Sequence, residues 1–120
     1  MRDAVAYQAQ LLRAIAELGP VRVLVNNAGR DDRHAMEDVT PEFWDDRIAL
    51  NLKHYFFAIQ AVAPGMADAG GGAVVCVGSP CGIMGFCSNE PAYSASKAGV
   101  MAMARVMATD RAFAKARRKS

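Results

Sequence analysis

Two short apolar runs, separated by stretches of helical periodicity, constrain the fold of this chain more than any other feature. Val21–Val25 and Ala73–Val77 are almost wholly apolar, as expected for strands buried in a parallel sheet. Helical patterns precede, separate and follow these runs, so the predicted order is helix, strand, helix, strand, helix. Strands joined by a crossover helix lie parallel and, by the right-handed rule, beside each other. The sequence therefore predicts an α/β fold with a doubly wound parallel sheet.

The predicted helices have recognisable starts and stops. Thr40 is a good N-cap and Pro41 a good first helical residue, and Pro91 opens a later helix in the same way. The apolar pattern after Pro41 is long enough for one helix of several turns, and Pro64-Gly65 should kink or fray its end. The three expected helices cover residues 3–18, 41–66 and 92–110.

Small and polar residues follow both predicted strands. Asn26-Asn27-Ala28-Gly29 comes after the first strand, and Gly78-Ser79 comes after the second. Ligands of open α/β sheets bind beyond the carboxyl ends of the strands, so both segments should face one crevice.

Tyr93 and Lys97 lie four residues apart on the helix that begins at Pro91, so the phenol and the ammonium share one face. A tyrosine has a reference pKa of about 10, and a neighbouring cation lowers it by favouring the phenolate. The pair is a candidate proton-transfer device. Taken alone, such a spacing more often marks an exposed helix face.

Composition narrows the class of protein. With 120 residues, 52% hydrophobic and 22% charged, the chain is one soluble globular domain at most. No apolar run approaches the ~20 residues of a membrane span, and the start lacks a signal-peptide core, so we expect a cytoplasmic protein with no membrane contact. The three cysteines, Cys76, Cys81 and Cys87, favour idle thiols over a disulfide or zinc site. His34 and His54 lack metal-ligand spacing and should be surface residues, and no metal is expected.

The positive charge is concentrated at one end of the chain. The net charge is +2, but residues 111–120 hold five basic residues and no acid, which leaves −3 on residues 1–110. We therefore expect a domain over 1–110 and a basic tail over 111–120. The distribution is no general nucleic-acid footprint, and a solvated helix extension is the favoured interpretation of the tail.

Four motifs together resemble the short-chain dehydrogenase/reductase family. They are Asn26-Asn-Ala-Gly29, Asn51, Ser79 and Tyr93-x-x-x-Lys97, and the resemblance covers about residues 12–110. It implies a Rossmann-like sheet and an oxidoreductase that moves hydride between NAD or NADP and a secondary alcohol or carbonyl. Segments over 31–41 and 56–62 are similar to the sugar-oxidising branch, the aldose 1-dehydrogenases, although that branch usually has a tryptophan-bearing loop after the serine.

The resemblance also implies residue roles. Tyr93 would be the general acid/base, Ser79 would hydrogen-bond the substrate oxygen, and Lys97 would lower the tyrosine pKa and grip the nicotinamide ribose. Asn51 would position a water in the relay to Lys97. The cofactor-binding residues would be Asn27, Ala28, Gly29, Tyr93 and Lys97. The simpler alternatives are a Ser79 that satisfies backbone groups and an Asn51 that faces solvent.

The chain departs from the family pattern in several places. The glycine-rich unit that binds pyrophosphate and the last strands have no counterpart, so we expect only the central segment of the sheet. The gap between Ser79 and Tyr93 is one residue longer than usual, and Pro80 biases Ser79 towards an extended backbone.

Two main hypotheses of function follow. The first is a short-chain oxidoreductase, and the second is an inactive truncated product that cannot bind cofactor alone. A binding module built on the basic tail is a weaker third. The family commonly associates through the long helix and the Tyr/Lys helix, so a homo-oligomer through 41–66 and 92–110 is expected. The sequence does not choose between NAD and NADP.

Overall fold

The computed structural model describes residues 3–85 and 87–109. The elements in chain order are α1 (Ala4–Leu18), β1 (Val23–Asn26), η1 (Met36–Asp38), α2 (Pro41–Ile48), η2 (Ala49–Lys53), α3 (His54–Asp68), β2 (Ala73–Cys76), η3 (Pro80–Gly82) and α4 (Pro91–Ala108). The basic tail predicted over 111–120 lies outside the described residues.

The two strands form a parallel sheet, as the apolar runs predict. Val23 pairs with Ala73 and Asn26 with Cys76, so both strands end at the same edge. One further backbone hydrogen bond joins the two segments just after the paired residues: the Val77 amide donates to the Asn26 carbonyl at 2.9 Å. The predicted α/β fold class is confirmed; β1 begins two residues later and ends one residue later than the predicted run 21–25, and β2 ends one residue before Val77.

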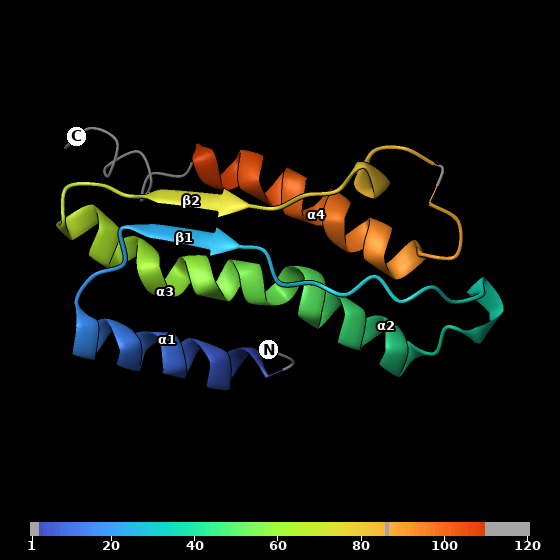
Figure 1. Cartoon of the computed structure of the whole chain (residues 1–120), viewed down its shortest axis with the longest axis horizontal. Coiled ribbons are helices and arrows are strands. Elements are labelled where there is room, and N and C mark those ends of the chain that lie inside the picture. Colours follow the sequence, from blue (N-terminus) through green and yellow to red (C-terminus); the bar gives the residue numbers. More distant parts are fainter. Residues whose placement is uncertain (1–2, 86, 110–120) are drawn as a thin grey trace.

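The sheet and the helices form two layers. Figure 1 shows β1 and β2 side by side, with α1, α3 and α4 arranged along them in a second layer. Residues that alternate along each strand differ in exposure: Leu24 and Asn26 are covered, whereas Val23 and Val25 are exposed. Because α3 contacts β1 and α4 contacts β2, the covered residues face the helices. Within the described residues, helices cover only one face of the sheet.

The helix starts are formed by the expected residues. Asp3 accepts a hydrogen bond from the Ala6 amide at the start of α1, and Thr40 accepts one from the Phe43 amide at the start of α2. Each bond satisfies one of the amides that the first helical turn leaves without a partner. Pro91 begins α4 directly after its N-cap Glu90, and the residue before that, Asn89, has a φ of 62° in the left-handed region.

The long central helix is not one α-helix, which corrects the sequence prediction. It is α2 up to Ile48, a π-helical turn over Ala49–Lys53, and α3 from His54. A π-turn accommodates one extra residue per turn and widens the helix, a feature common at functional sites. Side-chain periodicity hardly changes over five residues, so the apolar pattern does not reveal the turn.

The end of this helix also differs from the prediction. Pro64 lies inside α3, which continues to Asp68 instead of fraying at Pro64-Gly65. A proline removes one amide donor, but the packed face of α3 holds the helix together beyond it. The chain leaves the helix at Gly70 and Gly71, whose φ angles of 91° and 134° favour glycine.

The core is built around α3. Its buried face packs against α1 on one side and the strands on the other. The fully covered apolar residues of this face are Tyr55, Ala58, Ile59, Val62 and Met66. His54, expected at the surface, is only 1% exposed, and its ring packs at a steep angle to that of Tyr7 with the ring centroids 5.7 Å apart.

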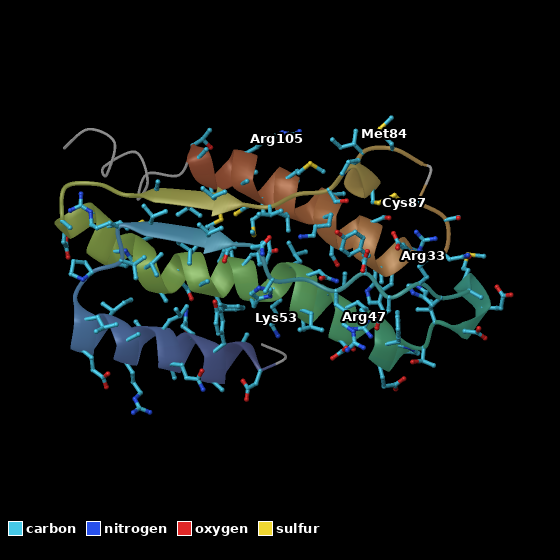
Figure 2. The ribbon with its side chains drawn as sticks, viewed as in Figure 1. Arg33, Arg47, Lys53, Met84, Cys87 and Arg105 are labelled. Carbon is cyan, nitrogen blue, oxygen red and sulfur yellow. A yellow bond between two sulfur atoms is a disulfide. The ribbon has the colours of Figure 1, made fainter. Side chains whose placement is uncertain are left out.

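The cysteines are the clearest error of the sequence prediction. Cys81 and Cys87 form a disulfide, and only Cys76 remains free. The two cysteines enclose a short loop, and no fixed spacing in a sequence predicts such a disulfide. In the folded chain their Cα atoms lie 5.4 Å apart. Figure 2 places Cys87 beside α4, in the segment that joins η3 to that helix.

Candidate active site at the strand ends

The carboxyl ends of both strands meet α3 and α4 at one place. The Asn26 side chain, buried at the end of β1, donates to the Tyr55 carbonyl on α3 at 3.4 Å. The chain then turns through Asn27, Ala28 and Gly29, and the equivalent position after β2 is Val77-Gly78. The two small and polar segments therefore face one crevice, as the parallel order predicts.

Lys97 is the central charged group of the site. It is only 3% exposed, and its Nζ donates to the Val77 carbonyl at 2.9 Å and to the Tyr55 hydroxyl at 3.2 Å. Burial lowers the pKa of Lys97 from its ordinary value, because the charged ammonium loses water. An ammonium has three donors, so two bonds to the protein leave one for a ligand.

Tyr93 stands one helical turn before Lys97, and the structure brings the two together. The Lys97 ammonium lies 5.8 Å from the centre of the Tyr93 ring. Tyr93 is half-buried, and both residues line the same cavity. The spacing in the sequence therefore corresponds to a real cavity wall and not to an exposed helix face.

Asn51 lies in the π-turn and is fully buried. Its Oδ1 accepts from the Arg30 amide at 2.7 Å, and its Nδ2 donates to the Arg30 carbonyl at 2.9 Å. The alternative of a solvent-facing Asn51 is therefore wrong. The side-chain amide binds both backbone groups of one residue and thereby fixes the loop that follows β1.

Gly29 occupies a position where a side chain would not fit. A Cβ atom at this residue would lie 2.9 Å from Asn51 Oδ1 and 3.6 Å from Lys97 Nζ. Both distances are measured to groups that the site holds in place. Glycine is needed here because the backbone passes close to the amide and the ammonium.

Ser79 is bound within its own loop. Its Oγ accepts a hydrogen bond from the Cys81 amide at 3.2 Å, and Ser79 caps the η3 turn that Pro80 begins. Gly82 in this turn touches the α4 backbone at Lys97 and Ala98, so η3 lies directly on the helix that carries the tyrosine. The hydroxyl proton of Ser79 is not used by this bond and can still be donated.

Tyr55 is the residue of the site that sequence reasoning missed. Its side chain is fully buried, and its hydroxyl donates to the Ala28 carbonyl at 2.8 Å while it accepts from Lys97. Burial raises the pKa of Tyr55 to about 12, so the hydroxyl keeps its proton. The only sequence signal is its position four residues after Asn51, about one helical turn away.

A cavity of about 210 Å³ opens at the strand ends. Its lining residues are Asn27, Gly29, Arg30, Asp31, Val77, Gly78, Tyr93 and Lys97. Ala28, Asn51 and Ser79 are not among them, so the structure brings only part of the predicted set to the cavity wall. A larger hollow beside Trp44 and Lys53 contains none of the predicted residues.

Two loops from distant parts of the chain contact each other ahead of α4. The His34 amide donates to the Asn89 carbonyl at 2.9 Å, and Arg33 approaches Glu90 at 3.5 Å. Figure 2 shows Arg33 and Cys87 at the same end of the molecule. The polar loop after β1 therefore borders the cavity and contacts the lead into α4, as its composition predicts.

A parallel sheet with a tyrosine and a buried lysine in a cavity at its strand ends defines a Rossmann-like α/β protein with a polar cavity. The chain belongs to the short-chain dehydrogenase family, because the family model described as short chain dehydrogenase matches residues 1–116.

Known proteins similar to this chain include sugar dehydrogenases. The chain is 46% identical over 108 residues to the probable galactose dehydrogenase GalD of Rhizobium meliloti, covering 90% of the chain and 42% of that protein. It is 50% identical over 95 residues to D-xylose 1-dehydrogenase of Caulobacter vibrioides, covering 79% and 38%. The resemblance to the sugar-oxidising branch is thereby confirmed. The chain spans about two fifths of the length of these curated relatives.

A solved structure agrees with the fold. The crystal structure of a short-chain dehydrogenase from Streptomyces avermitilis matches with a TM-score of 0.82 at 32% identity, over 89% of this chain and 39% of that one. The likeness supports the Rossmann-like assignment for the segment in hand.

Proposed function

We propose that this chain carries the catalytic centre of a short-chain oxidoreductase that moves hydride between a nicotinamide dinucleotide and a secondary alcohol or carbonyl. The observation that supports it best is the cavity wall shared by Tyr93 and the buried Lys97 at the carboxyl ends of both strands. A phenol and an ammonium held side by side suit proton transfer at a substrate oxygen. Family membership supports the same class of reaction.

We assign each residue the role that the family pattern implies. Tyr93 exchanges the proton of the substrate oxygen, and the free hydroxyl proton of Ser79 is donated to that oxygen. Lys97 offers its third donor to a ribose hydroxyl, and its ammonium lies 5.8 Å from the centre of the Tyr93 ring. Asn51 holds the loop after β1 through Arg30; whether it also positions a relay water stays a prediction.

The residues present fit the nicotinamide end of a dinucleotide. The backbone at Gly29 passes so close to Lys97 that a Cβ atom would fill the space, and a cavity opens beside it. Asn27, Ala28 and Gly29 would hold the adenosine side, and Tyr93 and Lys97 the nicotinamide ribose. The nicotinamide, when bound, donates or accepts the hydride. Both NAD and NADP remain candidates.

The proposed substrate class is an aldose or a related polyol. The support comes from the relatives, whose names refer to galactose and xylose. The polar and charged residues Arg30 and Asp31 in the cavity lining suit a ligand rich in hydroxyl groups.

Titration of the full chain with NADH, followed by nicotinamide fluorescence, tests the proposal. We expect a dissociation constant tighter than about 1 mM, which corresponds to about 4 kcal/mol. Lys97→Ala should abolish binding, and Lys53→Ala, at an exposed residue of η2, should not. Absence of binding to the unaltered, folded chain would contradict the proposal and favour the inactive fragment.

Tyr93→Phe tests the proton-transfer role. The change removes only the hydroxyl and leaves Lys97 to hold the ribose, so NADH binding should weaken far less than oxidation of D-xylose or D-galactose, which should fall at least about 100-fold. Tyr7→Phe is the matched control, because Tyr7 lies on α1 and contacts His54. Full turnover by the Tyr93→Phe chain would refute the role.

A further inference from the structure

Tyr55 forms a bridge that the proposed reaction does not use. Its hydroxyl lies between the Lys97 ammonium at 3.2 Å and the Ala28 carbonyl at 2.8 Å, and the ammonium stands 5.1 Å from the centre of the Tyr55 ring. The side chain is completely shielded from solvent. Hydroxyl groups at such depth are retained where they have partners, since an unpaired one is costly.

We propose that Tyr55 is a positioning residue for Lys97, which holds the ammonium at the strand ends and ties it to the turn after β1. The inference rests on the proposed function, in which Lys97 serves Tyr93 and the ribose. Tyr55 does not touch the reacting atoms in this scheme. It acts through the lysine and through Ala28.

A phenol fits this position because its two neighbours have opposite needs. An ammonium can only donate a hydrogen bond, and a carbonyl can only accept one. A neutral hydroxyl satisfies both at once, and it does so in one direction: it accepts from Lys97 and donates to Ala28. Its raised pKa keeps the proton in place at physiological pH, so the direction of the bridge is stable.

The bridge couples the two halves of the site. Lys97 belongs to α4, Ala28 to the turn after β1, and Tyr55 to α3, so one hydroxyl joins three segments. The Asn26 side chain adds a second link, from the end of β1 to the Tyr55 carbonyl. Without the hydroxyl, Lys97 would keep only the Val77 carbonyl as an acceptor among the described residues.

The effect should be visible in the titration of Lys97 itself. The Tyr55 oxygen accepts a hydrogen bond from the charged ammonium and therefore favours the charged form, against the effect of burial. Other titratable groups near the ammonium are Cys76, Tyr93 and His54. These stay unchanged in a Tyr55→Phe chain, so a shift would report the loss of the hydroxyl.

The experiment is a pH titration of the full chain with ¹³Cε-labelled lysine, followed by NMR. The lysines are Lys53, Lys97, Lys115 and Lys119, and the chain Lys97→Met identifies the resonance of interest. We expect the pKa of Lys97 to be lower by about 1 unit in Tyr55→Phe, because a hydrogen bond to a charged group is lost. Lys53 should not move, and Tyr7→Phe should leave Lys97 unchanged.

A second measurement covers the case in which Tyr55→Phe fails to fold. In the unaltered chain, the ammonium protons of Lys97 should exchange with water at least about tenfold more slowly than those of Lys53, since they are held by buried acceptors. Equal exchange rates, or a Lys97 pKa unaffected by Tyr55→Phe, would overturn the role. Neither measurement needs cofactor or substrate, so failure of NADH binding would count against the proposed function alone.

Discussion

At the scale of single residues, the site depends on polar side chains that bind backbone groups. Asn51 holds Arg30 through both its amide atoms, and Tyr55 holds Ala28 through its hydroxyl. These bonds fix the turn after β1, which has no regular secondary structure of its own. The turn can therefore present Gly29 to a ligand only while its buried partners remain in place.

Replacing Asn51 with leucine should destabilise the chain. The substitution removes the two part-buried hydrogen bonds that Asn51 makes to the amide and the carbonyl of Arg30, a loss of about 1–3 kcal/mol in the free energy of unfolding. Urea denaturation followed by circular dichroism measures it, with Gln10→Ala on the exposed surface of α1 as a control. A variant as stable as the parent would show that Arg30 finds other partners.

His54 should make stability depend on pH. Burial lowers its pKa from the ordinary 6.5, because the folded protein disfavours the charged imidazole. As pH falls below about 6.5, the unfolded chain takes up a proton that the folded chain does not, so stability is present above this pH and declines below it. Urea midpoints at several pH values should fall less towards acid in His54→Gln. An identical acid dependence in both chains would exclude His54 as a cause.

At the scale of elements, the segment between β2 and α4 packs on the helix that carries Tyr93 and Lys97. The η3 turn lies on α4 at Gly82, and the disulfide joins it to the residues just before Glu90. The Cys81 amide also donates a hydrogen bond to the Ser79 hydroxyl oxygen. The loop that carries the proposed substrate-binding serine is therefore attached at both of its ends.

Reduction of the disulfide should loosen this loop. A closed loop of this length contributes about 2 kcal/mol by restricting the unfolded chain. We expect dithiothreitol to lower the melting temperature and to speed proteolysis near Ile83 and Met84, and Cys87→Ser to reproduce both effects. Cys76→Ser is the matched control, since Cys76 is free and the reductant should still act on that chain. A melting temperature insensitive to reductant in all three chains would contradict the prediction.

At the scale of the whole molecule, one face of the sheet has no layer of helices over it within the described residues. Val25 is 57% exposed and Val75 48%, and both belong to the face opposite α3 and α4. Contiguous apolar surface of this kind is usually an interaction surface.

No described helix is both long and apolar enough to cross a membrane.

We expect the chain to self-associate, and variants can show which of two surfaces mediates the contact. The sequence predicts contacts through the helices of 41–66 and 92–110, whereas the structure adds the bare sheet face as a competing surface. Sedimentation should show oligomers at micromolar concentrations. Val25→Lys will weaken them at least tenfold if the sheet mediates contact, and Val106→Lys, at an exposed site on α4, if the helices do. A chain that is monomeric at about 100 μM would contradict both.

Much of the fold follows from local patterns in the sequence. The two apolar runs determine the strands and their parallel order, and Thr40, Pro41 and Pro91 determine where helices begin. The spacing of Tyr93 and Lys97 places them on one face, because four residues make about one helical turn. Such features depend on neighbours in the chain and can be predicted without knowledge of distant segments.

Only the tertiary structure determines which hydrogen-bond partners the polar side chains of the site have. Tyr55 and Lys97 are 42 residues apart, and Asn51 and Arg30 are 21 apart, so no periodicity connects them. The π-turn, the buried His54 and the Cys81–Cys87 bond likewise depend on how α3, η3 and α4 pack. Burial selects among many possible hydrogen bonds those whose donors and acceptors meet away from water. That selection is a property of the packed molecule, which is why it could not be predicted from the order of the residues.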